Sequence, residues 1–359
     1  MTNTLDHSIQ NRRILITCGT GGVGKTTLSA AIALRAALQG KHAVVITIDP
    51  AKRLATSLGL EKLGDTPTDL THLVQSACEK SGLECKGTLS AVVPDSQETL
   101  QKFIKSLAPT EQVREKLLNN PIIEIFSRDF SGANEYLALQ RVYALDRTKK
   151  FDFIVLDTPP SRNTLDFIEA PRLLARLFEE KLIRWLVLPA NKVVAAGMKK
   201  AMGILEKLTG SGFVNHLFDF GGALFEIQTS FLNSLERINA LLQSKDVGFL
   251  VVTAPTPETV PELEHFIQSV KDHKFHFDGI AVNRTLSGLT LDDHERENFE
   301  EAYQLLEALQ KRELTALRDL KKFTQGSNLF CAKLPELARD VHSVEDLFHV
   351  AMAFDRAHL

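Results

Sequence analysis

The chain has few cysteines and no paired arrangement of them. Four occur in 359 residues, Cys18, Cys78, Cys85 and Cys331, and no two of them form a C-x-x-C pair. A local zinc site, an iron–sulfur cluster and a disulfide framework therefore have no signature in this sequence.

Excess charge and long apolar runs are also lacking. The formal net charge is −3 at pH 7, which gives no electrostatic case for a nucleic-acid partner. No charge-free apolar run reaches the length of a membrane-spanning helix, and the polar segment 1–13 lacks the apolar core of a signal peptide. With 44% hydrophobic and 24% charged residues, the composition is typical of a globular chain with a full core. We therefore expect a cytoplasmic protein of one large domain or two smaller ones.

A glycine-rich segment near the start of the chain carries the most specific signal. Residues 19–27 read GTGGVGKTT and match the phosphate-loop pattern G-x-x-x-x-G-K-[ST]. An apolar run at 13–17 precedes the segment and an Ala- and Leu-rich stretch at 28–38 follows it, so the strand–loop–helix context agrees. Lys25 is predicted to reach the β- and γ-phosphates of a nucleotide, and the Thr26 hydroxyl to ligate Mg²⁺. The residues predicted to bind the nucleotide here are Gly21, Gly22, Val23, Gly24, Lys25, Thr26 and Thr27.

Apolar runs of strand length recur along the chain, with helical stretches between them. They lie at 14–17, 43–48, 89–93, 153–156, 249–253, 279–282 and 329–332. Most lack polar alternation, which indicates strands buried on both faces, as in a parallel sheet. The sequence therefore predicts an α/β fold, a P-loop nucleotidase with a mostly parallel sheet flanked by helices.

Polar residues and turn-formers follow these runs, where the ligand of an open α/β sheet is expected. Asp49 follows the second run, Asp157 the fourth, Asn283 the sixth, and Pro335 the last. In such a nucleotidase one carboxylate orients the attacking water and the other holds Mg²⁺, usually through a water molecule. The alternative is that each aspartate only caps the helix that follows it.

The alternation of strands and helices stops between about 168 and 245. Apolar residues there recur at helical spacing, and Phe213, Phe218, Phe225 and Phe231 lie among them. We predict a phosphate-loop domain at 11–167 and 246–359, and a helical insert at 168–245 to which helices from 100–145 contribute. These phenylalanines either form part of a core or line an apolar surface that is exposed when nucleotide is bound.

Three segments together resemble a known family. They are GGVGKTT at 21–27, TIDPA at 47–51 and LDTPPS at 156–161. The chain resembles the arsenical pump-driving ATPases and the related Get/TRC ATPases that target tail-anchored membrane proteins, and it is most similar to the bacterial Get-like branch. The resemblance implies ATP and Mg²⁺ as cofactors, with Lys25 and Asp49 as catalytic residues and Asp49 orienting the water. It further implies that Asp157 belongs to the second switch and holds Mg²⁺ through water, that Asn283 hydrogen-bonds adenine, and that the segment around Pro335 packs on the base.

The chain departs from that family in three respects. Thr20 stands where the family usually has a second lysine that reaches the partner's phosphates across a dimer. The C-x-x-C pair that holds an interface zinc in eukaryotic targeting factors is missing, and the arsenite-binding cysteine arrangement is not recognisable. The insert also has only Met198 and Met202, so Phe and Leu supply most of its apolar surface.

The favoured function is an ATPase whose nucleotide cycle opens and closes a hydrophobic helical surface for a membrane-protein client. The alternatives are an anion- or arsenite-pump ATPase subunit and a positioning ATPase of the MinD type. The expected partners are a second copy or a paralogue that retains the lysine, a hydrophobic helical client and a membrane receptor, with no nucleic acid. Against the positioning role, segment 344–359 reads as a packed helix of mixed charge rather than as a membrane anchor.

Overall fold

The computed structural model describes residues 4–48, 53–60, 63–123, 132–158, 166–177, 211–286, 289, 299–325, 329–337 and 339–354. The chain forms two compact units. The first unit comprises Met1–Pro94, Ala144–Leu165 and Leu242–Leu359, and the second comprises Asp95–Tyr143 and Asp166–Leu241.

The first unit is built on an eight-stranded sheet with the order β3-β4-β2-β5-β1-β6-β7-β8. Its strands are β1 (Ile14–Cys18), β2 (His42–Thr47), β3 (Thr68–Asp69), β4 (Thr88–Val92), β5 (Phe153–Asp157), β6 (Val247–Thr253), β7 (Phe277–Thr285) and β8 (Phe330–Pro335). All neighbouring strands pair in parallel except β3, which is antiparallel to β4. The predicted α/β fold with a mostly parallel sheet is therefore confirmed. Only the short edge strand β3 was not predicted, because its two exposed polar residues carry no apolar signal.

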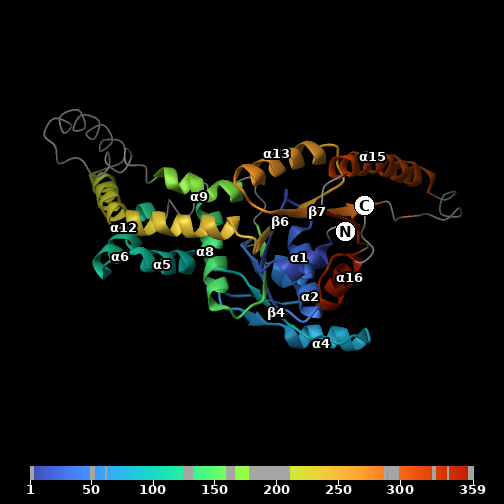
Figure 1. Cartoon of the computed structure of the whole chain (residues 1–359), viewed down its shortest axis with the longest axis horizontal. Helices are drawn as coiled ribbons and strands as arrows, with labels where there is room; N and C mark the ends of the chain where they lie inside the picture. The colour runs from blue at the N-terminus through green and yellow to red at the C-terminus, as the bar shows by residue number, and fades with distance from the viewer. Residues whose placement is uncertain are drawn as a thin grey trace. The chain divides into compact units, whose positions relative to one another are not determined.

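Helices alternate with these strands along the first unit (Figure 1). They are α1 (Leu5–Asn11), α2 (Lys25–Leu38), α3 (Arg53–Ser57), α4 (Thr71–Lys80), α13 (Thr259–Asp272), α15 (Glu300–Thr324) and α16 (Val344–Ala353). Helix α2 presents a run of buried alanines, and these small side chains let it lie close to β2 and β5. Gly40 follows the end of α2 with a φ of +89°, a conformation that favours glycine beyond a helix end.

Both faces of the sheet are buried, which explains why its strands lack polar alternation. Leu15, Val45 and Val155 belong to the core that includes α2 and α16, while their neighbours Ile14 and Val44 point to the opposite face and are also buried. Helix α16 packs against α2 and α4. The predicted C-terminal helix is therefore a packed element over Val344–Ala353. None of the helices formed by the described residues is long and apolar enough to cross a membrane.

The second unit is helical throughout its described part. Its helices are α5 (Ser96–Leu107), α6 (Glu111–Leu118), α8 (Ala133–Thr148), α9 (Asp166–Leu177) and α12 (Ser211–Gln243), of which α8 and α12 continue past the boundaries of the unit. Phe103, Tyr136 and Phe231 form an aromatic cluster with ring centroids 5.5 to 5.8 Å apart. Beside this cluster, the Gln140 side-chain amide donates hydrogen bonds to the Tyr136 hydroxyl at 2.6 Å and to the Ser234 hydroxyl at 2.8 Å.

The four phenylalanines predicted to form part of a core or to line an apolar surface do not share one environment. Phe231 is only 5% exposed and belongs to the aromatic core, which corresponds to the core alternative. Phe225 is 54% exposed and Phe218 is half-buried, and their exposure with nucleotide bound stays a prediction. The side chain of Phe213 lies outside the described residues.

Candidate functional site

The phosphate loop connects the end of β1 to the start of α2, as the motif predicts. Gly24 is the N-cap of α2 and has a φ of +88°, in the left-handed region. A Cβ atom at this position would lie 2.4 Å from Nδ2 of Asn283. Both the backbone conformation and the close approach of Asn283 therefore require glycine here.

Lys25 is the first residue of α2 and its side chain is turned back onto the loop. The residue is 6% exposed, and its ammonium donates hydrogen bonds to the carbonyl oxygens of Gly19 at 2.7 Å and Thr20 at 2.8 Å. A phosphate oxygen would compete with these carbonyls for the same three N–H donors. The loop thus holds the ammonium group against its own first residues, and the predicted contact of Lys25 with nucleotide phosphates stays a prediction.

Asp157 ends β5 and is completely buried. Its Oδ2 atom accepts hydrogen bonds from the hydroxyls of Thr26 and Thr47, each at 2.7 Å. The Ser29 hydroxyl lies 3.4 Å from the other oxygen, Oδ1. The hydroxyl donors Thr26 of the phosphate loop and Thr47 of β2 therefore compensate the cost of burying this carboxylate.

The residues around Asp157 fit a magnesium ion held with a nucleotide. Because Thr26 donates its proton to Asp157, the lone pairs of its hydroxyl oxygen remain available to a cation. Mg²⁺ prefers oxygen ligands and in phosphate-transfer enzymes is held by one or two protein groups, the phosphates and water. Within the described part of the chain no cluster of three His, Cys, Asp or Glu residues could hold a metal by itself. We therefore assign Thr26 as the direct ligand and Asp157 as its support, as a proposal.

Asn283 and Arg284, at the end of β7, contact the phosphate loop. The Asn283 amide donates to the Val23 carbonyl oxygen at 2.9 Å, and Arg284 donates to the Gly22 carbonyl oxygen at 3.1 Å. Arg284 has a left-handed φ of +62° and forms an ion pair with Glu336 at 3.2 Å. These contacts place Asn283 beside the nucleotide loop, and its predicted bond to adenine stays a prediction.

Two further predicted site residues, Pro335 and Asp49, differ in whether the structure describes them. Pro335 ends β8, is exposed, and pairs in register with Thr285 of β7, so it lies at the sheet edge that carries Asn283. Asp49, the predicted water-orienting residue, lies outside the described residues.

Thr47, Thr17 and Ser29 were not singled out from the sequence, although all three belong to the Asp157 cluster. The Thr17 hydroxyl lies 2.7 Å from that of Ser29 and donates to the Leu156 carbonyl oxygen at 3.1 Å. The available signal was a threonine at or near the end of two buried apolar runs. That signal becomes specific only when the order of the strands is known.

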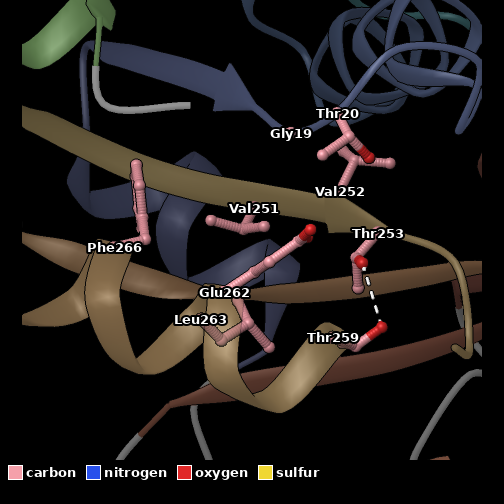
Figure 2. Close-up of a pocket in the computed structure, with 9 residues that line it drawn as sticks. All are labelled: Gly19, Thr20, Val251, Val252, Thr253, Thr259, Glu262, Leu263 and Phe266. Carbon is pink, nitrogen blue, oxygen red and sulfur yellow. Dashed lines mark hydrogen bonds between the residues drawn. The ribbon is translucent and has the colours of Figure 1, made fainter. Parts of the chain in front are cut away.

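A small pocket opens beside the first residues of the phosphate loop (Figure 2). Its lining comes from the loop start, the end of β6 and the first turns of α13, namely Gly19, Thr20, Val251, Val252, Thr253, Thr259, Glu262, Leu263 and Phe266. Glu262 is the charged member of this lining. Thr20 therefore faces an acidic side chain in this lining, while its carbonyl oxygen accepts a hydrogen bond from Lys25.

Cys78 and Cys85 are neighbours, Cys18 and Cys331 lie on separate strands, and three of the four thiols have a raised pKa. Burial raises the pKa of Cys18 in β1 and of Cys331 in β8 to about 12. Burial and the neighbouring Cys85 raise the pKa of Cys78 to about 11. Strands β1 and β8 are separated in the sheet by β6 and β7. Among the described residues, these cysteines form no group of three or more ligands that could hold a metal ion.

The chain is similar to known ATPases over most of its length. The profile of a family described as anion-transporting ATPase matches residues 12–354. A protein of Aquifex aeolicus provisionally named arsenical pump-driving ATPase 2 is 27% identical over 279 residues, covering 76% of this chain and 80% of its own length. The ATPase ASNA1 homolog 1 of Paramecium tetraurelia is 25% identical over 289 residues, covering 79% and 78%. The ATPase get3 of Schizosaccharomyces japonicus is 24% identical over 273 residues, covering 75% and 73%.

Proposed function

Because the chain belongs to the anion-transporting ATPase family, we propose that its ATP hydrolysis opens and closes an apolar helical surface that binds a membrane-protein client. ATPase activity itself follows from membership of the family. The client is proposed to be a hydrophobic helix, and Mg²⁺ is proposed to accompany ATP at Thr26 and Asp157.

The observation that carries this proposal is a second apolar face on α12. One face of the helix packs into the second unit through residues such as Phe220, Ile227 and Phe231. Beside it, Leu217, Phe218 and Leu224 are half-buried and Phe225 is 54% exposed, again at helical spacing. Apolar surface left in water costs about 25 cal/mol per Å², so clustered exposed residues of this kind favour a partner.

The order of the chain supports a link between this surface and the nucleotide. Asp157 ends β5 in the first unit, and α9 in the second unit begins at Asp166. The connecting segment 158–165 carries the motif that follows Asp157 in the family resemblance. A movement of Asp157 on nucleotide binding would therefore be transmitted through this short segment to α9 of the second unit, which is the unit proposed to bind the client.

A role in a metalloid pump is the less supported alternative. The Aquifex relative carries a pump name, but such a role needs a soft-metal site built from thiolates. Here Cys18 and Cys331 lie on strands that β6 and β7 separate, and burial raises the pKa of Cys18, Cys78 and Cys331. Because no group of three metal ligands occurs among the described residues, the client-binding proposal is favoured.

Site-specific photo-crosslinking tests this proposal. A crosslinking amino acid is placed at Phe225 and, as a matched control, at Leu314 of α15, which is 52% exposed. The probe is a leucine-rich helical peptide of transmembrane length, offered with ATP and Mg²⁺, with ADP, or without nucleotide. We expect crosslinking at position 225 that depends on nucleotide and disappears when serines interrupt the peptide, with little at 314. Equal yields at both positions, or none at 225 with any nucleotide, would overturn the proposal, and stimulation of the ATPase by arsenite would favour the pump role.

A further inference from the structure

Asp157 lies in a row of three hydroxyl and carboxylate side chains across neighbouring strands. Strand β5 is between β2 and β1, and the register pairs Asp157 with Thr47 on one side and with Thr17 on the other. Residues paired in this way on parallel strands present their side chains to the same face of the sheet. Thr17 and Asp157 are each 0% exposed and Thr47 is 1% exposed, so water cannot replace a hydrogen bond lost among them.

The two threonines act on the carboxylate by different routes. The Thr47 hydroxyl donates directly to Oδ2 of Asp157 at 2.7 Å. Thr17 instead lies 2.7 Å from Ser29, whose hydroxyl in turn lies 3.4 Å from Oδ1. Thr47 is therefore the strand residue that contacts the same carboxylate oxygen as Thr26.

This shared oxygen connects Thr47 to the residue assigned to the cation. Thr26 donates to Oδ2 at 2.7 Å, and this bond fixes the direction of its hydroxyl proton and hence of its lone pairs. Thr47 lies at the end of β2, outside the phosphate loop, and its hydroxyl reaches Thr26 through the shared oxygen of Asp157. Resting on the proposed roles of Thr26 and Asp157 toward Mg²⁺, we propose that Thr47 is a positioning residue of the ATPase, which holds Asp157 so that Thr26 can bind the cation.

The inference predicts a specific loss when the Thr47 hydroxyl is removed. With one donor fewer on Oδ2, the carboxylate can turn toward other donors, and Thr26 loses its fixed acceptor. A hydrogen bond to a charged group is worth about tenfold or more in an equilibrium constant. Nucleotide binding in the presence of Mg²⁺ should therefore weaken about tenfold, whereas binding in EDTA, which does not use Thr26 as a ligand, should change little.

Calorimetric titration with a non-hydrolysable ATP analogue, across a Mg²⁺ series and in EDTA, measures this split. Thr47→Val removes the hydroxyl at constant shape, Thr47→Ala removes it in a smaller side chain, and Thr47→Ser keeps it. Thr259→Val is the matched control, because Thr259 is also buried in the first unit but donates to the Ala254 carbonyl oxygen, at 2.6 Å, rather than to a carboxylate. Thermal unfolding in the absence of nucleotide identifies which variants fold.

The expected result is a loss confined to the Mg²⁺-dependent part of binding in Thr47→Val and Thr47→Ala, recovery in Thr47→Ser, and no such loss in Thr259→Val. An equal loss in EDTA and in Mg²⁺, or wild-type binding by both hydroxyl-free variants, would overturn the inference. Asp157→Asn in the same titration distinguishes failure of the role proposed for Thr47 from failure of the role proposed for Asp157. If it loses Mg²⁺ dependence while Thr47→Val does not, only the role of Thr47 fails, and if it binds like the wild type, the role of Asp157 fails as well.

Discussion

Alanine at Gly24 should destabilise the first unit more than alanine at Gly22, although both glycines have a left-handed backbone. The φ angle is +88° at Gly24 and +80° at Gly22. A residue with a Cβ atom costs about 1–2 kcal/mol in this conformation, so both substitutions carry that penalty. The difference between them must come from what the new methyl group meets.

At Gly22 the methyl group would meet nothing within 4 Å, whereas at Gly24 it would lie 2.4 Å from Nδ2 of Asn283. Asn283 would have to move, and its hydrogen bond to the Val23 carbonyl oxygen would be lost. A neutral hydrogen bond contributes about 0.5–1.5 kcal/mol. The expected losses are therefore about 1–2 kcal/mol for Gly22→Ala and about 1.5–3.5 kcal/mol for Gly24→Ala.

Urea unfolding without nucleotide, followed by far-UV circular dichroism, measures these losses. Adding Asn283→Ala removes the group that the methyl would strike, so in that background the cost of Gly24→Ala should fall to that of Gly22→Ala. The cycle formed by the single and double variants should then show a coupling of about 1 kcal/mol. Equal costs for Gly22→Ala and Gly24→Ala, or a cost for Gly24→Ala that Asn283→Ala leaves unchanged, would refute the reasoning.

Much of the first unit could be predicted from the sequence, because its strands are short apolar runs that end at turn-formers. Burial of both faces removes polar alternation, and this leaves a signal that is local in the chain. The observed strands differ from the predicted runs mainly at their ends, since terminal residues such as His42 and Thr285 pair in the ladder without being apolar. Strand β3 was missed because its pairing with β4 depends on tertiary structure.

Some residues of the site could be predicted from local sequence, whereas others depend on the order of the strands in the sheet. Lys25 and Thr26 follow from a motif, and Asp157 from its place after a buried run. The role of Thr47 was not predictable in this way, because β2 follows β1 in the chain while β5 lies between them in the sheet. Only that order makes Thr47 a neighbour of Asp157.

The helical insert shows a different limit of sequence reasoning. Helical spacing indicates which residues share a face of α12, but it does not indicate which face meets another helix. Phe231 is buried because Phe103 of α5 and Tyr136 of α8 pack against it, and Phe225 remains 54% exposed on the same helix. The partners that decide burial lie more than ninety residues away in the chain.

Four further outcomes are expected. Lys25→Ala should remove most ATP affinity in calorimetry, because it deletes the cation that faces the phosphates, and unchanged binding would end the assignment. Asp49→Asn should keep ATP binding but lower turnover by about 10² or more, and a wild-type rate would show that Asp49 only caps a helix. Thr20→Lys should raise ATPase activity or ATP-dependent dimerisation of the isolated chain, unless the wild type is already fast alone. Asp6→Asn should lower stability at pH 7 but have little effect near pH 2. The reason is that Arg35 hydrogen-bonds the Asp6 carboxylate at 2.6 and 2.8 Å and holds its pKa below the usual value. A carboxyl group with a lowered folded pKa binds its proton more weakly in the folded than in the unfolded chain, so its contribution is complete above about pH 4 and is lost as the pH falls through the folded pKa. Urea midpoints of wild type and variant should therefore converge below pH 4, and a difference that stays constant from pH 7 to pH 2 would show that the charge on Asp6 is not what stabilises α1 against α2.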